Sequence, residues 1–426
     1  MNTELFLYKK SCDLVEKAVR LIAILSVVIA ISFFLFVPLS NDDVAYFKEQ
    51  SFTFNWIINE RYMTWSSRVI LESVLPFLCN HDYVFRSVSV AFIAFNIYSI
   101  KLIFNSFSLS FVLLFLSLFP FYNLESAGLV ATTVNYYYPA VLGLFIVGVL
   151  LKDKKISMWT VLAVILSSII ATNHEQMSLI LVILSSLFLI KNRHNALAIG
   201  VLLLSILGLL NCALCPGNHI RLVAETAKWM PEFSDYSFFD KVYLGISSTL
   251  YFLNFSEPFF LILLTSILLF LYKKKMLIVL STLVFIYMVL RLPVRMFMKS
   301  AGVILDGNFI YNFPFLSLLL LLAWDLFIFF LLVKSVFNIK VKILLITLFI
   351  LANLVRASVG LSPTVFASLS RPSIFSEIII VISSMIIFEN IMSLCNQQYL
   401  NKLKLLICCF AIYSNIHTFI SLIHVI

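Results

Sequence analysis

Long apolar stretches separated by short polar breaks run through almost the whole of this 426-residue chain. A helix needs about 20 mostly apolar residues to cross the hydrocarbon core of a membrane. The composition agrees, because 62% of the residues are hydrophobic and only 12% are charged, too few to cover a water-facing surface. The chain is therefore predicted to be an all-α polytopic membrane protein, with about 11 to 13 transmembrane helices in one domain over residues 1–426. The predicted spans are 20–40, 84–104, 106–122, 136–151, 156–173, 175–190, 195–213, 243–271, 276–291, 311–334, 341–357, 373–391 and 403–424, with a break near Glu257-Pro258.

The basic residues predict the orientation of these spans. Lysine and arginine collect in cytoplasmic loops, and a cytoplasmic N-terminus puts the lysine-rich connections on that side, which accounts for the net charge of +9 without nucleic-acid binding. The opposite, outer side carries mainly arginine: Arg61, Arg68, Arg86, Arg221, Arg291, Arg295, Arg356 and Arg371. Because guanidinium groups suit bidentate recognition of phosphate and carboxylate, we expect any chemistry to face outward.

Two outer segments, 41–83 and 214–242, are predicted to form the outward, catalytic face of the protein. The first contains a second apolar stretch, Val69 to Leu78, which is too short to span a membrane and is predicted to be a helix lying along its surface.

Asp42 and Asp43 directly follow the first predicted span. Paired carboxylates at a membrane boundary raise each other's pKa and suit a general base or a cation ligand. The alternative is that these residues only cap the helix that follows. Both interpretations stay open from the residues alone.

Tyr62, Trp65 and Arg68 form an aromatic and basic segment in the first outer loop, and Asn135-Tyr136 opens a later span. Sugars stack on aromatic faces and arginine binds phosphate, so the first segment is a candidate sugar-phosphate site. Aromatic and basic residues also anchor proteins at the membrane interface, which is the competing interpretation for both segments.

A short polar turn and a Pro-Gly-Asn sequence complete the candidate set. His174 and Glu175 lie between two predicted spans, where polar side chains are costly unless they line a hydrated cavity. The second histidine of a zinc-protease motif is missing, because position 178 is Ser. Asn218 and Arg221 follow the seventh span, next to a glycine that lets a ligand approach the backbone. Arg295 and Arg371, on later outer segments, are further candidates for phosphate binding.

The order and sidedness of these motifs resemble the multi-pass bacterial glycosyltransferases of the GT-C architecture, especially the phage-type O-antigen glucosyltransferases that change serotype. The resemblance covers residues 40–375 approximately and is carried by Asp-Asp after the first span, Trp-Ser-x-Arg, Asn-Tyr, His-Glu, Pro-Gly-Asn-x-x-Arg and a late Ser-Pro and Arg. It implies a GT-C-like fold in the bacterial inner membrane, with a cytoplasmic N-terminus and a periplasmic active site.

The resemblance also implies an inverting transfer of a sugar, glucose in that family, from a polyprenyl-phosphate donor to O-antigen or another lipopolysaccharide or surface polysaccharide. Asp42 or Asp43 would be the catalytic base, and Arg68, Arg221, Arg295 and Arg371 would bind the donor phosphate. Substrate-binding roles fall on Tyr62, Trp65, Asn135, Tyr136, His174, Glu175 and Asn218. A small flippase and a polyprenyl-phosphate sugar synthase are the implied functional partners. Arginine can neutralise the leaving phosphate, so we expect no requirement for a divalent metal or another cofactor.

Two other classes compete with this prediction. An O-antigen or capsule polymerase is also multi-pass with outer arginines, but we expect it to have a larger outer loop than 214–242. A transporter of lipid-linked sugars would place charges in mid-membrane positions. Asp325, in the middle of the span 311–334, is one such charge and is either a proton or ion relay or a paired structural acid.

Overall fold

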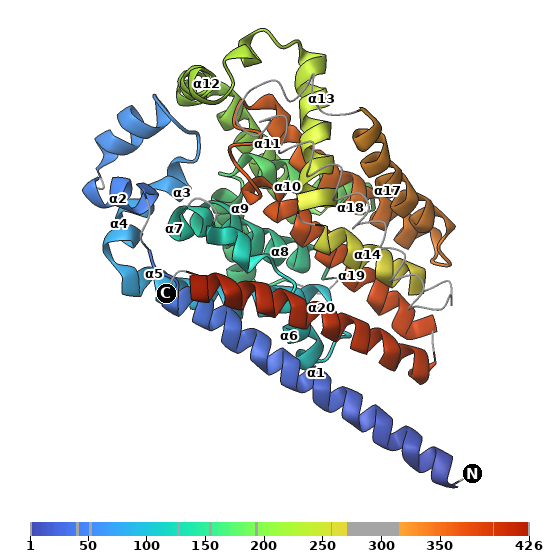
Figure 1. The fold of residues 1–426 in the computed structure, drawn as a ribbon. Helices are drawn as coiled ribbons and strands as arrows, with labels where there is room; N and C mark the ends of the chain where they lie inside the picture. The colour runs from blue at the N-terminus through green and yellow to red at the C-terminus, as the bar shows by residue number, and fades with distance from the viewer. Residues whose placement is uncertain are drawn as a thin grey trace.

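The computed structural model describes residues 2–39, 42–50, 53–125, 128–152, 156–191, 195–256, 258–270, 315–394 and 396–424, and all regular structure within these ranges is helical. Figure 1 shows the long helices α1 and α20 side by side along one edge of the bundle. The helices are α1 (Asn2–Phe36), α2 (Asp42–Glu49), η1 (Trp56–Tyr62), α3 (Val69–Ser73), α4 (Leu75–Asn80), α5 (Asp82–Ile103), α6 (Leu109–Leu116), η2 (Phe121–Glu125), α7 (Leu129–Thr132), η3 (Thr133–Tyr137), α8 (Tyr138–Leu150), α9 (Met158–Ala171), α10 (Glu175–Lys191), α11 (Ala196–Leu214), α12 (Pro216–Trp229), η4 (Pro231–Ser234), α13 (Phe238–Thr249), η5 (Leu250–Ser256), α14 (Phe259–Phe270), α17 (Phe315–Lys334), α18 (Ile339–Ala357), η6 (Ser358–Leu361), η7 (Arg371–Ser373), α19 (Ile374–Leu394) and α20 (Gln397–His424).

Among the described residues, seven helical segments are long and apolar enough to cross a membrane, or eight if α13 and α14 together form one bent span. The seven are Cys12–Phe36, Asp82–Ile103, Leu129–Leu150, Ala196–Leu214, Ile339–Leu361, Arg371–Leu394 and Gln397–Ile423. The prediction of an all-α protein with many apolar spans is thus confirmed in its coarse form. The predicted span 276–291 lies outside the described residues.

Three predicted spans are shorter in the structure than a membrane crossing requires. The prediction of one helix over 106–122 is wrong, because α6 has only 8 residues and is followed by turns, Pro120 and the short helix η2. Proline has no backbone N–H and disfavours a helical conformation of the residue before it. The helices α9 and α10 have 14 and 17 residues, which at 1.5 Å per residue corresponds to about 21 and about 26 Å.

The break predicted near Glu257-Pro258 is present. Helix α13 continues into the π-helix η5, and the chain then turns by 71° into α14. A proline at this point cannot continue the hydrogen-bond ladder of the preceding helix.

The segments predicted to lie outside the membrane gather at one end of the bundle, which we call the polar end. It comprises α2, η1, α3 and α4, the turn between α9 and α10, helix α12, and the connection from η6 to η7. The predicted surface helix over Val69 to Leu78 is present as α3 and α4. Its two sides differ, since Leu71 and Leu75 are buried whereas Ile70 and Phe77 are exposed.

Helix α12 has its polar side turned inward. Gly217 is buried, and Arg221 and Glu225 on the same side of the helix are partly buried, whereas Ile220 and Val223 are exposed by 53% and 71%. A Cβ atom at Gly217 would collide with the backbone of the first loop at Tyr62 and Trp65. Glycine therefore permits the close approach that brings the polar side of α12 against that loop.

Helix α13 also packs closely against the end of α18 and the start of η6. A Cβ atom at Gly245 would lie closer to the carbonyl oxygen of Ala357 than the 3.0 Å limit that real Cβ atoms respect, and it would also meet Gly360. Since backbone atoms cannot move aside as a flexible side chain can, this contact depends on glycine at both positions.

We expect Gly245→Ala to destabilise the protein by about 1–3 kcal/mol, because overpacking forces the two backbones apart. The measurement is thermal unfolding of the purified protein in detergent. Gly200→Ala in α11 is the control, since nothing lies within 4 Å of the added methyl group; it should be neutral or gain about 0.5–1 kcal/mol. Equal melting of Gly245→Ala and the wild type would contradict this packing.

Candidate functional site

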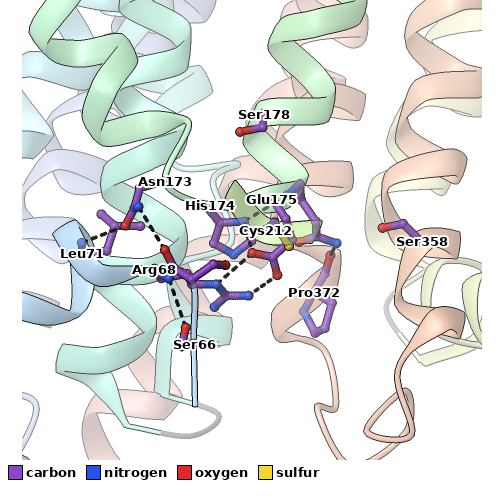
Figure 2. A network of polar contacts seen from close by, with 12 residues as sticks. Ser66, Arg68, Leu71, Asn173, His174, Glu175, Ser178, Cys212, Ser358 and Pro372 are labelled. Carbon is purple, nitrogen blue, oxygen red and sulfur yellow. Dashed lines mark hydrogen bonds and ion pairs between the residues drawn. The ribbon is translucent and has the colours of Figure 1, made fainter. Parts of the chain in front are cut away.

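The centre of the polar end is an ion pair between Arg68 and Glu175. Arg68 Nε donates to Glu175 Oε2 at 2.9 Å, and Nη2 donates to Oε1 of the same carboxylate. The two side chains come from the first loop and from the first turn of α10, 107 residues apart (Figure 2). Burial disfavours the charge of the Arg68 guanidinium, but the Glu175 carboxylate more than offsets this and raises the pKa of Arg68. Both groups are therefore charged at neutral pH.

Asn173 joins the same two segments through backbone hydrogen bonds. Its Oδ1 accepts from the N–H groups of Ile70 and Leu71 at 3.0 and 3.1 Å, and its Nδ2 donates to Ser67 O at 3.3 Å (Figure 2). The first N–H groups of a helix have no partner within it. Asn173 thus caps the N-terminus of α3 from a distant part of the chain.

Helix α12 closes the site from a third direction. Asn218 Oδ1 accepts from the backbone N–H of Ser67 at 3.3 Å, and its Nδ2 lies 3.3 Å from Ser67 Oγ. The guanidinium of Arg221 lies 5.3 Å from the ring centre of Trp65, within the range of a cation–π interaction. Cys215 Sγ donates to Tyr62 O at 3.1 Å.

Tyr136 and His174 form the inner wall of the site. The Arg68 guanidinium lies 5.7 Å from the ring centre of Tyr136, and the His174 ring lies 4.9 Å from the rings of both Tyr136 and Phe375. His174 Nδ1 accepts the backbone N–H of Gln176 at 3.2 Å, so the ring proton of neutral His174 is on Nε2. Nε2 is buried and has no hydrogen-bond partner in the described part of the chain.

The structure thus brings four of the residues that the sequence singled out into one set of contacts, which are Arg68, Tyr136, His174 and Glu175. Four more lie beside this set: Asn218 binds Ser67, next to Arg68, Trp65 contacts Arg221, and Tyr62 accepts a hydrogen bond from Cys215 through its backbone carbonyl. Asn135 is buried next to Tyr136, and its Nδ2 donates to Ala131 O, four residues earlier in α7, at 2.9 Å.

The other candidates stand apart from this group or beyond the described residues. Arg371 donates from Nε to Ser368 O at 3.3 Å, and the carbonyl of its neighbour Pro372 accepts from Gln176 at 3.3 Å. Arg295 lies outside the described residues. Asp42 and Asp43 begin α2, which packs against α4 and α7 at the polar end, but their side chains are not among those described.

Sequence reasoning did not find a second ion pair in the first loop. Arg61 Nε donates to Glu72 Oε2 at 2.6 Å, and both side chains are buried. The rings of Tyr46, Phe47, Trp56 and Trp65 surround the Arg61 guanidinium at 5.5–5.9 Å. Arg61 therefore holds α2, η1 and α3 together. The high density of aromatic residues around one arginine was the only sequence signal of this arrangement.

No family model, curated protein or solved structure matches the chain, so these comparisons assign it to no family.

The buried state of His174 predicts a pH dependence of stability. Burial first and the neighbouring Arg68 second lower the pKa of His174 from 6.5 to about 3. Between these two values the unfolded chain binds a proton that the folded chain does not, so the stability due to His174 falls as the pH drops through this window.

We expect acidification from pH 7 to pH 5 to lower the melting temperature of the wild type more than that of His174→Phe, which keeps a ring between Tyr136 and Phe375. Thermal unfolding in detergent at each pH measures this difference. His219→Phe, at an exposed position of α12, controls for the loss of a histidine as such. An identical pH dependence of His174→Phe and the wild type would contradict the assignment.

Proposed function

We propose that this protein is an inverting glycosyltransferase that moves a sugar from a polyprenyl-phosphate donor to a polysaccharide or lipopolysaccharide acceptor. One observation carries the proposal: the ion pair of Arg68 with Glu175 and the cation–π contact of Trp65 with Arg221 join the first outer loop to α10 and to α12 at the polar end of an apolar helical bundle. This combination suits a substrate with a sugar, a phosphate and a lipid chain.

The contacts at the site fit the parts of such a donor. Trp65 is only partly buried and supplies aromatic surface for a sugar ring, next to the guanidinium groups of Arg61 and Arg221 that contact it. Arg68 uses Nε and Nη2 for Glu175, which leaves the N–H groups of Nη1 for a phosphate oxygen. The Glu175 carboxylate keeps Arg68 in place and can also accept a sugar hydroxyl, since each oxygen has more than one lone pair.

The proposed reaction needs a base and stabilisation of a leaving phosphate. Asp42 or Asp43 takes the proton of the acceptor hydroxyl. The oxygen of that hydroxyl at the same time forms a bond to the anomeric carbon of the donor sugar. The bond from that carbon to the donor phosphate breaks, the phosphate keeps the electron pair, and the configuration inverts. We assign the stabilisation of the negative charge that develops on the phosphate to four arginines: Arg68, Arg221, Arg295 and Arg371.

The GT-C architecture, the bacterial inner membrane and the periplasmic position of the site belong to the same proposal. They rest on the motif order and on the sidedness of the basic residues. Glucose as the donor sugar rests on family resemblance alone.

We expect Asp42→Asn or Asp43→Asn to lower the rate of sugar transfer by at least about a hundredfold, the usual contribution of a general base. The measurement is transfer of a labelled sugar from polyprenyl-phosphate sugar to polysaccharide in membranes that contain the variant, with insertion checked by immunoblot. Asp82→Asn, at an exposed position in the first turn of α5, is the matched control. Full activity of both single variants would refute the catalytic assignment.

A transporter of lipid-linked sugars is the second candidate, because of one buried acid. Asp325 in α17 accepts from Asn254 Nδ2 at 3.0 Å, and Asn254 lies in η5 just before the 71° bend. An ionisable side chain at such a position is a common feature of ion or proton pathways. Movement of a lipid-linked sugar across proteoliposome membranes that Asp325→Asn abolishes and Asp42→Asn preserves would favour this function over the first.

A further inference from the structure

Helix α12 exposes apolar side chains on the side that faces away from the candidate site. Four exposed apolar residues follow one another at the helical spacing of three and four: Ile220, Val223, Ala224 and Ala227. Leu222 lies next to them and is also exposed. We call these five residues the outer side of α12. Since an amphipathic helix normally turns its apolar stripe toward a protein core, the outer side requires a different partner.

Contacts with the first loop oppose any rotation of α12 that would bury its outer side. A Cβ atom at Gly217 would collide with the loop backbone, so the helix lies directly against it. Asn218 contacts Ser67 at 3.3 Å through both atoms of its amide, and the Arg221 guanidinium lies over the ring of Trp65. A rotation of α12 would break these contacts. The exposure of the outer side therefore follows from how the polar side is bound.

The outer side continues an exposed surface of α11, a helix long and apolar enough to span a membrane. Exposed apolar residues of α11 recur every three or four positions and end at its last residue: Ile199, Leu203, Ile206, Leu207, Leu210 and Leu214. The other side of α11 packs on α9 and α10. In a membrane span, an exposed stripe of this kind faces lipid acyl chains. Only Cys215 separates α11 from α12, so this surface leads directly to the outer side.

A second exposed apolar surface follows α12 at the start of α13. It consists of four side chains: Phe238, Phe239, Val242 and Ile246. Together with α14, helix α13 forms the bent candidate span. One candidate span thus ends where α12 begins, and the next one begins shortly after α12 ends. Because both must meet the same boundary of the membrane, α12 lies at that boundary, and the exposed acids Glu232 and Asp235 of the connection belong in water.

Helix α12 is too short and too polar to be a span itself. Its 14 residues correspond to about 21 Å, and they include Arg221, Glu225 and Lys228. Figure 1 shows α12 almost end-on and α13 from the side, so the two helices run in different directions. A helix with one apolar and one polar side at the membrane boundary has the properties of an interfacial helix.

We propose that the outer side of α12 and the exposed start of α13 bind the phospholipid leaflet at the polar end of the bundle. The apolar side chains lie where headgroups meet acyl chains, and the exposed Lys228 reaches the headgroup phosphates. Helix α12 is then a wall between the leaflet and the residues on its polar side, Trp65 and Arg221 among them. Part of the segment 214–242, expected from the sequence to lie outside the membrane, is thereby assigned to its interface.

The test measures the surroundings of single fluorescent side chains in the full chain. An environment-sensitive fluorescent amino acid replaces Val223 or Phe239 by stop-codon suppression, and Glu232 is the control position because it is exposed in η4. The protein is placed in phosphatidylcholine nanodiscs and quenched with a nitroxide high on the lipid acyl chain or with aqueous iodide. We expect the lipid nitroxide to quench at Val223 and Phe239 at least about threefold more than at Glu232, and iodide to show the reverse order.

Iodide quenching that is equally strong at Val223 and Glu232 would overturn the proposal, because the outer side would then face water. Protection of Val223 from both quenchers would also overturn it and would indicate that a second copy of the chain or another protein covers the outer side. The same label at Ala227, one turn further along the stripe, keeps the test decisive if the label at Val223 disturbs folding. The measurements contain no sugar donor and no acceptor, so failure of the proposed function would leave their result unchanged.

Discussion

The ion pair between Arg68 and Glu175 is the contact on which the polar end depends. Two charges near a low-dielectric bundle are stable only if each finds a partner of opposite sign with good geometry. This requirement brings the first loop to the start of α10, and Asn173 and Asn218 then fix the backbone of Ser67 from two sides. Because these two charges pair, the ring of Tyr136 lies next to the N–H groups of Arg68 that Glu175 does not use.

Much of the architecture could be predicted from periodic apolar stretches, because the membrane imposes helical structure and a minimum length on every crossing. The break near Pro258 and the short helix after Val69 were predictable for the same reason, since a proline and a stretch of limited length are visible in the sequence. The failure at 106–122 is instructive. A mostly apolar stretch gives little signal of where a helix stops, and the apolar residues around Pro120 led to the prediction of one continuous span.

The pairing of charges was not predictable in the same way. The sequence identified Arg61 and Arg68 as outer arginines suited to phosphate or carboxylate, and Glu175 as a polar side chain that is costly outside a hydrated cavity. However, eight outer arginines and a similar number of acids allow many combinations. The combination that forms depends on helix packing, and that packing depends on contacts such as those of Gly217 and Gly245, where a single methyl group would separate two backbones. The hydrogen bonds of Arg356 to Ser373 and Val365 likewise depend on the path of the connection from η6 to η7, which apolar periodicity does not encode.

The cap that Asn173 provides for α3 also has a consequence for biosynthesis. Its two acceptor contacts reach Ile70 and Leu71, 103 and 102 residues earlier in the chain. A ribosome delivers the first loop well before it delivers the asparagine, so α3 is made without its cap, and Arg68 without its carboxylate. The first loop therefore stays incomplete until the turn after α9 reaches the same side of the membrane. Its completion depends on correct placement of the whole chain from α5 to α9.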